Sequence, residues 1–249
     1  MRILFFLFIV LLGSCKTEKQ KLSAQQIIDK TIETAGGDRY NNAEINFTFR
    51  NIKYKSIRQN SRFSLQRMLP DTLNTLDIIT NEGFMRIQNE EQVVLHDTTA
   101  VKYEESVNSV HYFMHLPFGL NDEAVKKKLL GEVTIKDKQY YKLEVTFKEE
   151  GGGVDYQDIF LYWVSKDNFT IDYLAYKFFT NEGGIRFRES FNPRVIKGIR
   201  FVDYKNYSPQ KSDVDFYKID DLYKKGKLKE LSVIENKNIE VQLLTPGSV

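Results

Sequence analysis

Two arginines on one expected strand are the side chains of this sequence best placed to bind an anion. Arg186 and Arg188 alternate with Ile185 and Phe187 in an expected strand over 184–191, so both guanidinium groups are predicted on one face of a sheet. Guanidinium groups bind carboxylates and phosphates through paired N–H donors. The neighbouring expected strands carry further polar and aromatic residues, namely Asp172, Tyr173, Tyr176, Arg200, Asp203 and Tyr204.

This patch has two interpretations. If the strands pair in register, its side chains gather inside a concave sheet and orient the polar head of an amphiphilic ligand. Alternatively, they form a salt-bridge ladder on an outward face, where each pair contributes little and no function is implied. The ligand-binding interpretation predicts that all residues of the patch contact the ligand.

A histidine pair offers a second kind of chemistry. His111 and His115 are four residues apart, the spacing that turns both imidazole rings to one side of a helix for zinc. The glutamate that follows the first histidine in metalloprotease helices is missing. A third ligand would have to be His96 or a distant carboxylate, so a metal site is the weaker alternative. No cofactor is expected, and no Ser–His–Asp set or paired-carboxylate spacing is legible.

A ladder of antiparallel strands must position the arginine patch. Apolar and polar residues alternate with a period of two between Gly, Asn and Asp turns, the pattern of strands that bury one face or both. The expected strands of this ladder are 139–147, 158–164, 170–180, 184–191 and 198–207. More strands are expected over 43–69, 74–88 and 91–95, and closing strands over 214–219 and 228–234; 122–130 is expected to be a short helix or turn.

Two helices are expected to cover this sheet. Ser23 and Gln26 form a capping box before an amphipathic helix over 24–35. A second helix is expected from Thr98 or Thr99 to about His115, ending before Pro117, with an apolar stripe formed by Tyr103, Val107, Val110 and Met114. The predicted fold is α+β and mainly antiparallel β, a curved open half-barrel sheet covered by the N-terminal and mid-chain helices in one domain over 23–249.

The first residues predict an exported, lipid-anchored protein. A positive residue and an apolar run over 3–12 are typical of a signal peptide over 1–14. The ending Leu-Gly-Ser-Cys resembles the bacterial lipobox, which implies lipidation of Cys15 and a polar tether over 15–22. Lys16 stands where an inner-membrane retention signal has Asp, which favours the outer membrane, facing either the periplasm or the outside.

The balance of charges in the sequence argues against nucleic acid as a partner. Lys and Arg number 36 and Asp and Glu 34, giving a net charge of +2, and the charges are interspersed. A basic footprint for nucleic acid is therefore absent. Cys15 is the sole cysteine of the sequence, so it is neither a disulfide partner nor a plausible nucleophile.

The pattern as a whole resembles lipoproteins with a lipoprotein-carrier (LolA/LolB-like) open barrel, a fold in which a curved sheet holds acyl chains in its hollow. More narrowly, several stretches resemble a Bacteroidota family of outer-membrane lipoproteins of unknown function. These stretches are Phe-Met-His-Leu-Pro-Phe-Gly-Leu at 113–120, Tyr-Tyr-Lys at 140–142, Asp-Tyr-Leu-Ala-Tyr at 172–176, Gly-Ile-Arg-Phe-Arg at 184–188 and Gly-Ile-Arg-Phe-Val-Asp-Tyr at 198–204. The narrow family implies no activity, and a fold does not fix a function.

Three functions follow in order of preference. The first is a non-catalytic lipoprotein, anchored to the membrane through Cys15, that binds a lipid or other amphiphile in the concave sheet. The second is an interaction or scaffold lipoprotein that binds an envelope protein. The third is a metal-dependent hydrolase using His111 and His115.

Overall fold

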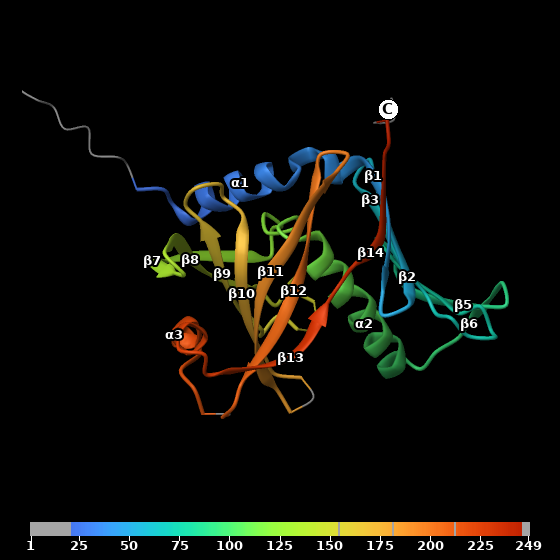
Figure 1. Ribbon diagram of the computed structural model, residues 1–249. Coiled ribbons are helices and arrows are strands. Elements are labelled where there is room, and N and C mark those ends of the chain that lie inside the picture. Colours follow the sequence, from blue (N-terminus) through green and yellow to red (C-terminus); the bar gives the residue numbers. More distant parts are fainter. Residues whose placement is uncertain (1–20, 154, 181, 212, 246–249) are drawn as a thin grey trace, which may run out of the picture.

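Two antiparallel sheets with helices between and beside them form the structure, a computed structural model that describes residues 21–153, 155–180, 182–211 and 213–245 (Figure 1). The predicted signal peptide, Cys15 and most of the tether lie outside the described residues. The predicted fold class is confirmed, and its strands divide between two seven-stranded sheets. Among the described helices, none combines the length and apolar character needed to cross a bilayer.

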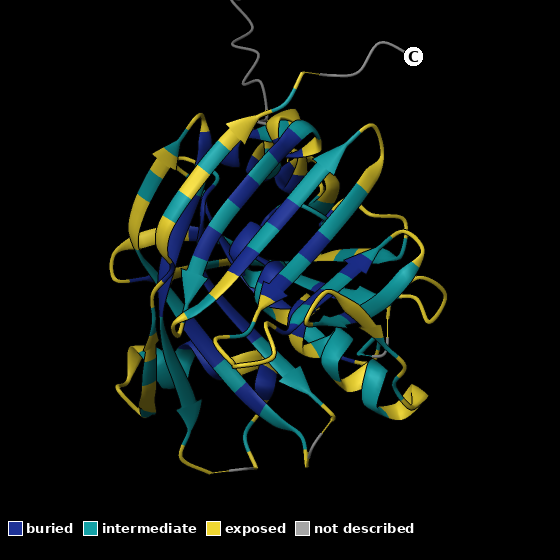
Figure 2. Cartoon of the chain, turned by 90° about the vertical axis from the view of Figure 1, so that its right-hand side faces the viewer, coloured by how far each residue is buried: buried dark blue, intermediate teal, exposed yellow. Residues whose placement is uncertain are grey.

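The first sheet has the strand order β14-β1-β2-β3-β4-β5-β6. Its strands are β1 (Ala43–Phe49), β2 (Ile52–Gln59), β3 (Arg62–Met68), β4 (Leu76–Thr80), β5 (Gly83–Gln88), β6 (Glu91–Val93) and β14 (Lys237–Leu243). Buried and more exposed residues alternate along these strands, which face the viewer in Figure 2. The alternation shows that one face of this sheet is covered and the other meets solvent.

The second sheet has the order β13-β12-β11-β10-β9-β8-β7. Its strands are β7 (Val125–Ile135), β8 (Lys138–Phe147), β9 (Ile159–Ser165), β10 (Ile171–Phe178), β11 (Gly184–Ile196), β12 (Ile199–Pro209) and β13 (Leu228–Ile234). The expected ladder corresponds to β8 through β12, and each strand pairs with the next by a hairpin connection.

Two expectations for the flanking segments were wrong. The segment 122–130, expected to be a helix or turn, begins β7, because β7 pairs with β8 along its whole length. The segment 214–219, expected to be a strand, instead leads into η2 (Phe216–Lys218) and α3 (Ile219–Lys224). The expected strand over 228–234 is β13.

The central strands of the second sheet are buried on both faces, unlike those of the first sheet. On its outer face, α3 covers a cluster that includes Trp163 and Phe187, both fully buried. Lys142 on β8 donates to Asp220 of α3 at 2.6 Å and to the Tyr217 carbonyl at 2.7 Å. These buried polar contacts fix the short helix on the sheet, since either charge alone in that place would be costly.

Helix α1 (Ala24–Ala35) lies along the inner face of the second sheet and crosses the top of the molecule in Figure 1. Its capping box forms as predicted: the Ser23 hydroxyl accepts from the Gln26 amide and the Gln26 side chain accepts from the Ser23 amide. Ile27 and Ile28, both fully buried, join the core on this face. The helix ends at Gly36, whose φ of 136° favours glycine.

Helix α2 (Asp97–His115) occupies the space between the two sheets (Figure 1). Val107 and Met114 pack against the first sheet, as the predicted apolar stripe requires. On its other side, Tyr112 and Phe113 pack into the core of the second sheet. The interior of the molecule is therefore filled largely by this helix.

Candidate functional site

A buried guanidinium group marks the inner face of the second sheet. Arg188 on β11 is 8% exposed and lies 3.8 Å from the ring centroid of Phe113 on α2. It donates to the Tyr176 hydroxyl of β10 at 3.0 Å, whereas its buried Nε has no hydrogen-bond partner. No ion pair joins Arg188 to a carboxylate anywhere in the described chain. The faces of aromatic rings and one hydroxyl group are the groups that stabilise the Arg188 charge in place of water.

A second arginine lies near the same place. The side chain of Arg200 on β12 borders a hollow between α1 and β12, together with Val202 and Tyr204. Burial lowers the pKa of Arg200, and the charge of Asp172 acts in the opposite direction. Burial raises the pKa of the Tyr204 hydroxyl to about 12, and the positive charges of Arg188 and Arg200 act against that rise. Both cations therefore act on one buried tyrosine.

Tyrosine hydroxyls complete this polar interior. The hydroxyls of Tyr112 on α2 and Tyr162 on β9 are 2.6 Å apart and hydrogen-bonded. Burial raises the pKa of both groups, so both stay neutral and protonated. We define the inner arginine site as Arg188, Arg200, Tyr112, Tyr162, Tyr176 and Tyr204. Its two cations and four hydroxyls offer many donors and no carboxylate.

The structure brings together only part of the predicted patch. Arg188, Tyr176, Tyr204 and Arg200 share the inner face. Arg186 is on the same face of β11 but nearer the strand end, half-buried beside the Phe178 ring at 5.1 Å.

The other predicted residues lie elsewhere. Tyr173 belongs to the cluster on the outer face. Asp203 is 2% exposed and is satisfied by Asn192, Arg194 and the Asn236 amide. Asp172 accepts from Tyr140 and Thr170 at a register irregularity of β10, where a bulge turns its side chain away from the inner face.

Sequence reasoning missed Tyr112 and Tyr162 as members of the site. Tyr162 alternates with Leu161 and Trp163 and shares a face of its strand with Phe160 and Val164. The sequence therefore already indicated on which side of the sheet Tyr162 lies. No such indication existed for Tyr112, because this residue lies off the apolar stripe from which the buried side of α2 was predicted.

The free space at the site is small. The hollow beside Arg200 has a volume of about 10 Å³, enough for about one water molecule. The inner face of the sheet is otherwise packed by α1 and by Tyr112 and Phe113 of α2. An acyl chain can therefore enter only if the side chains that pack this face, among them Tyr112 and Phe113, move away from it.

The histidine pair is packed against the first sheet. His111 and His115 are 1% and 3% exposed, and their ring centroids are 5.4 Å apart. His111 Nε2 donates to the Gln66 carbonyl at 3.0 Å, and His115 Nε2 is 3.1 Å from the Ser56 hydroxyl. The described residues include no group of three or more His, Cys, Asp or Glu side chains that could hold a metal ion.

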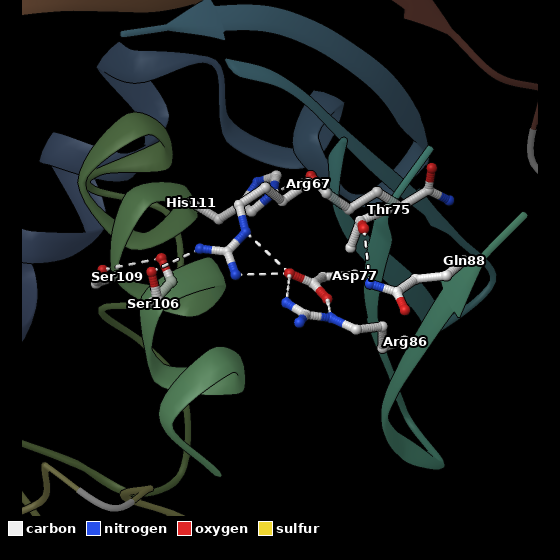
Figure 3. Close-up of polar contacts among 9 residues, drawn as sticks. Arg67, Thr75, Asp77, Arg86, Gln88, Ser106, Ser109 and His111 are labelled. Atoms are coloured by element: carbon white, nitrogen blue, oxygen red, sulfur yellow. Dashed lines mark hydrogen bonds and ion pairs between the residues drawn. The ribbon is translucent and has the colours of Figure 1, made fainter. Parts of the chain in front are cut away.

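A charged network that the sequence did not predict also joins α2 to the first sheet (Figure 3). Asp77 on β4 is fully buried between Arg67 and Arg86, which bond to it at 2.6 Å and 2.7 Å. Arg67 also donates to the Ser106 hydroxyl of α2 at 2.6 Å, and Arg86 lies 3.6 Å from the Tyr103 ring centroid. This network holds the N-terminal half of α2 on the strands.

Comparison with known proteins agrees with the fold. A LolA-superfamily protein from Nitrosomonas europaea superposes with a TM-score of 0.52 at 15% identity, over 92% of this chain and 96% of that one. A DUF1329-family protein from Desulfovibrio piger superposes with a TM-score of 0.51 at 13% identity, over 88% and 93%. Among curated proteins, none is significantly similar in sequence. The family of unknown function DUF6503 matches residues 1–236, and the chain therefore belongs to it.

Proposed function

We propose that this chain is a lipid-anchored lipoprotein of the outer membrane that binds an amphiphile between α2 and the second sheet. Arg188 and Arg200 meet the anionic head of the ligand, and the aromatic inner face receives its apolar part. The similarity of its fold to a LolA-superfamily structure supports this proposal.

The observation that carries the proposal is the burial of Arg188 without an acidic partner. Taking an unpaired charge out of water costs several kcal/mol, and a methionine in its place would pack among the same rings at no such cost. A buried cation lined by hydroxyl donors is arranged to receive an anion.

The contacts of α2 indicate how the site opens. Within the described residues, Ser106, His111 and His115 hydrogen-bond to the first sheet. Towards the second sheet, α2 has the Tyr112–Tyr162 hydrogen bond and the packing of Phe113. The ligand therefore displaces Tyr112 and Phe113 while α2 stays on the first sheet.

Extraction of the purified full chain followed by lipid mass spectrometry tests this function. We expect an amphiphile with an anionic head to co-purify with the wild type, and Arg188→Met to lower its recovery about tenfold, the usual worth of a charge-assisted hydrogen bond. Arg50→Met, which removes an exposed arginine outside the site, should leave recovery unchanged. A wild-type chain that carries no amphiphile and takes up none from mixed micelles contradicts the proposal.

The membrane anchor has a separate test. Radiolabelled fatty acid fed to cells should label the wild type, and Cys15→Ser should abolish the label. Protease applied to intact cells should then distinguish a surface-facing chain, which is cleaved, from a periplasmic one, which is protected. An unlabelled wild-type chain would remove the anchor from the proposal.

The packed interior favours one alternative function, a scaffold lipoprotein that binds an envelope protein through its outer surface. In-cell cross-linking that captures the same protein with the wild type and with Arg188→Met, together with an empty interior, favours this alternative. A metal-dependent hydrolase has no comparable support, since both histidines are enclosed in hydrophobic packing.

A further inference from the structure

An open hollow at the end of the first sheet forms a second basic site, which shares no residue with the inner arginine site. Its volume is about 390 Å³, within the range of small-molecule sites. The hollow is bounded by the segment before β1, by the β2–β3 hairpin and by the loop that follows α2. Its lining includes Asn41, Asn42, Arg58, Arg62, Phe63 and Phe118. Of the described residues that line it, none is acidic.

Arg58 is the fixed cation of this hollow. Its guanidinium lies between the rings of Phe118, at 4.7 Å, and Phe63, at 5.4 Å. The Phe118 ring is itself stacked on Tyr40 with centroids 5.1 Å apart, so one wall is anchored in the core. Two aromatic faces thus hold the guanidinium in one orientation, which reduces the entropy lost when a ligand binds.

The charge of Arg58 is not neutralised by the protein. Its Nε is buried without a hydrogen-bond partner, and no ion pair involves it in the described part of the chain. Burial lowers the pKa of Arg58, an effect that the more distant carboxylate of Asp122 opposes. Asn42 Oδ1 is a second buried atom of the lining without a partner. Both atoms are left for a ligand that accepts from the arginine and donates to the amide oxygen.

The exposed Arg62 supplies a second positive charge. The pairing of β2 with β3 sets Arg58 opposite Phe63 and Gln59 opposite Arg62. Neighbouring rungs turn their side chains to opposite faces of a sheet, and Arg62 borders the hollow at the turn end of the hairpin, where it belongs to the lining. Two guanidinium groups at one hollow suit an anion with several acceptor oxygens, and a phosphate monoester offers three. The ring faces of Phe63 and Phe118 can pack against the carbon atoms of the ester, and the amide oxygen of Asn42 can accept a hydrogen bond from one of its hydroxyl groups.

We propose that this hollow binds a polyol phosphate ester, with Arg58 and Arg62 on the phosphate and Asn42 on a hydroxyl. Such a group occurs in soluble polyol phosphates and in the phosphoglycerol heads of lipids.

Isothermal titration calorimetry of the full chain in uncharged detergent micelles, with sn-glycerol 3-phosphate as the probe, tests the proposal. We expect saturable binding that weakens with added salt, because screening reduces the attraction at an open site. Arg62→Gln changes an exposed side chain and should weaken binding about tenfold, the worth of a charge-assisted hydrogen bond. Arg58→Gln should weaken binding at least as much.

Arg50→Gln is the matched control. Arg50 also lies over a phenylalanine ring of the first sheet, that of Phe49 at 5.0 Å, but it is outside the hollow. Its substitution should leave the affinity unchanged. The proposal is overturned if the wild type shows no saturable binding, or if Arg62→Gln binds as tightly as Arg50→Gln.

Nanodiscs distinguish the two sources of the phosphate. In discs that contain phosphatidylglycerol, an apparent affinity for glycerol 3-phosphate lower than in micelles supports a lipid head as the occupant. An affinity equal to that in micelles supports a soluble ester. Since this site shares no residue with the inner arginine site, Arg188→Met should leave glycerol 3-phosphate binding intact, and failure of either proposal is separate from failure of the other.

Discussion

At the scale of single residues, two arginines of β11, one buried and one partly exposed, illustrate opposite uses of a charge. Arg194 donates to Asp203, which is 2% exposed, at 2.9 Å and to the Asn236 carbonyl at 2.6 Å, so it neutralises a buried carboxylate. Arg188 on the same strand has only aromatic rings and the Tyr176 hydroxyl. The first arrangement stabilises the fold, whereas the second costs stability in the unliganded chain.

Replacing each of these arginines by methionine should therefore give different results. Arg194→Met removes a partner from buried Asp203 and should lower the free energy of unfolding by about 2 kcal/mol, the usual range for a hydrogen bond to a charged group. Arg188→Met should leave the free energy unchanged or raise it by about 1 kcal/mol, since a methionine fits the apolar surroundings. Urea unfolding followed by circular dichroism measures both. Equal destabilisation by the two variants would mean that Arg188 is structurally satisfied after all.

At the scale of elements, α2 is the helix on which both the packing and the site depend. Its two neutral histidines lie against the first sheet, where protonation would place charge beside Arg58 and in apolar surroundings. Burial lowers the pKa of His111 to about 4, with the Gln66 carbonyl acting against the shift and Arg58 adding to it. Burial lowers the pKa of His115 well below its ordinary value, and His111 and Arg58 act in the same direction.

This arrangement makes the α2–first sheet interface sensitive to acid. Because the folded pKa is depressed, the unfolded chain takes up the proton first as pH falls below about 6.5, and folded stability is lost from there downwards. We expect His111 to contribute a loss of about 1.4 kcal/mol per pH unit between about 6.5 and its folded pKa. Urea unfolding at several pH values, compared between the wild type and His111→Phe, measures this slope.

The contribution of His111 is the difference in the free energy of unfolding between the wild type and His111→Phe at each pH. Burial raises the pKa of Asp158 to about 6, so this carboxyl group contributes in the opposite direction over part of the same range. Its contribution cancels when the wild type and His111→Phe are compared. His111→Phe leaves the Gln66 carbonyl without its donor and should be less stable at neutral pH. Parallel curves for the two chains would show that His111 does not carry the acid sensitivity.

At the scale of the whole molecule, a strand from the C-terminal region completes the first sheet. β14 pairs with β1, and the Leu244 amide donates to the Asn42 carbonyl at 2.9 Å. Ile239 and Val241 of β14 pack on the core that contains Ile45. Chain ends far apart in the sequence are thereby joined in one sheet, and the edge of β1 is covered.

Removal of residues 237–249 should expose that edge. An uncovered strand edge pairs with other chains, so we expect self-association and a lower free energy of unfolding. Analytical ultracentrifugation should show oligomers of the shortened chain, whereas removal of residues 246–249 alone should leave the sedimentation coefficient unchanged. A monomeric and equally stable shortened chain would show that β14 is dispensable.

The sequence by itself determined the ladder β8–β12, both principal helices and the class of the fold. These are local matters: a period of two, a period of 3.6 and a capping box all act between near neighbours. Alternation also placed Arg188, Tyr176 and Tyr204 on a shared face. The same rule separates adjacent residues of one strand, which is why Tyr173 and Asp203 lie on the opposite face from Tyr204.

Only the tertiary structure decided what fills the space inside. The division into two sheets, the contribution of β14 and the place of α2 between the sheets depend on contacts between segments far apart in the chain, which no local period encodes. The bulge that redirects Asp172 and the lack of an acid beside Arg188 are decided in the same way. A charge pattern states which groups are present, and packing alone determines which of them meet.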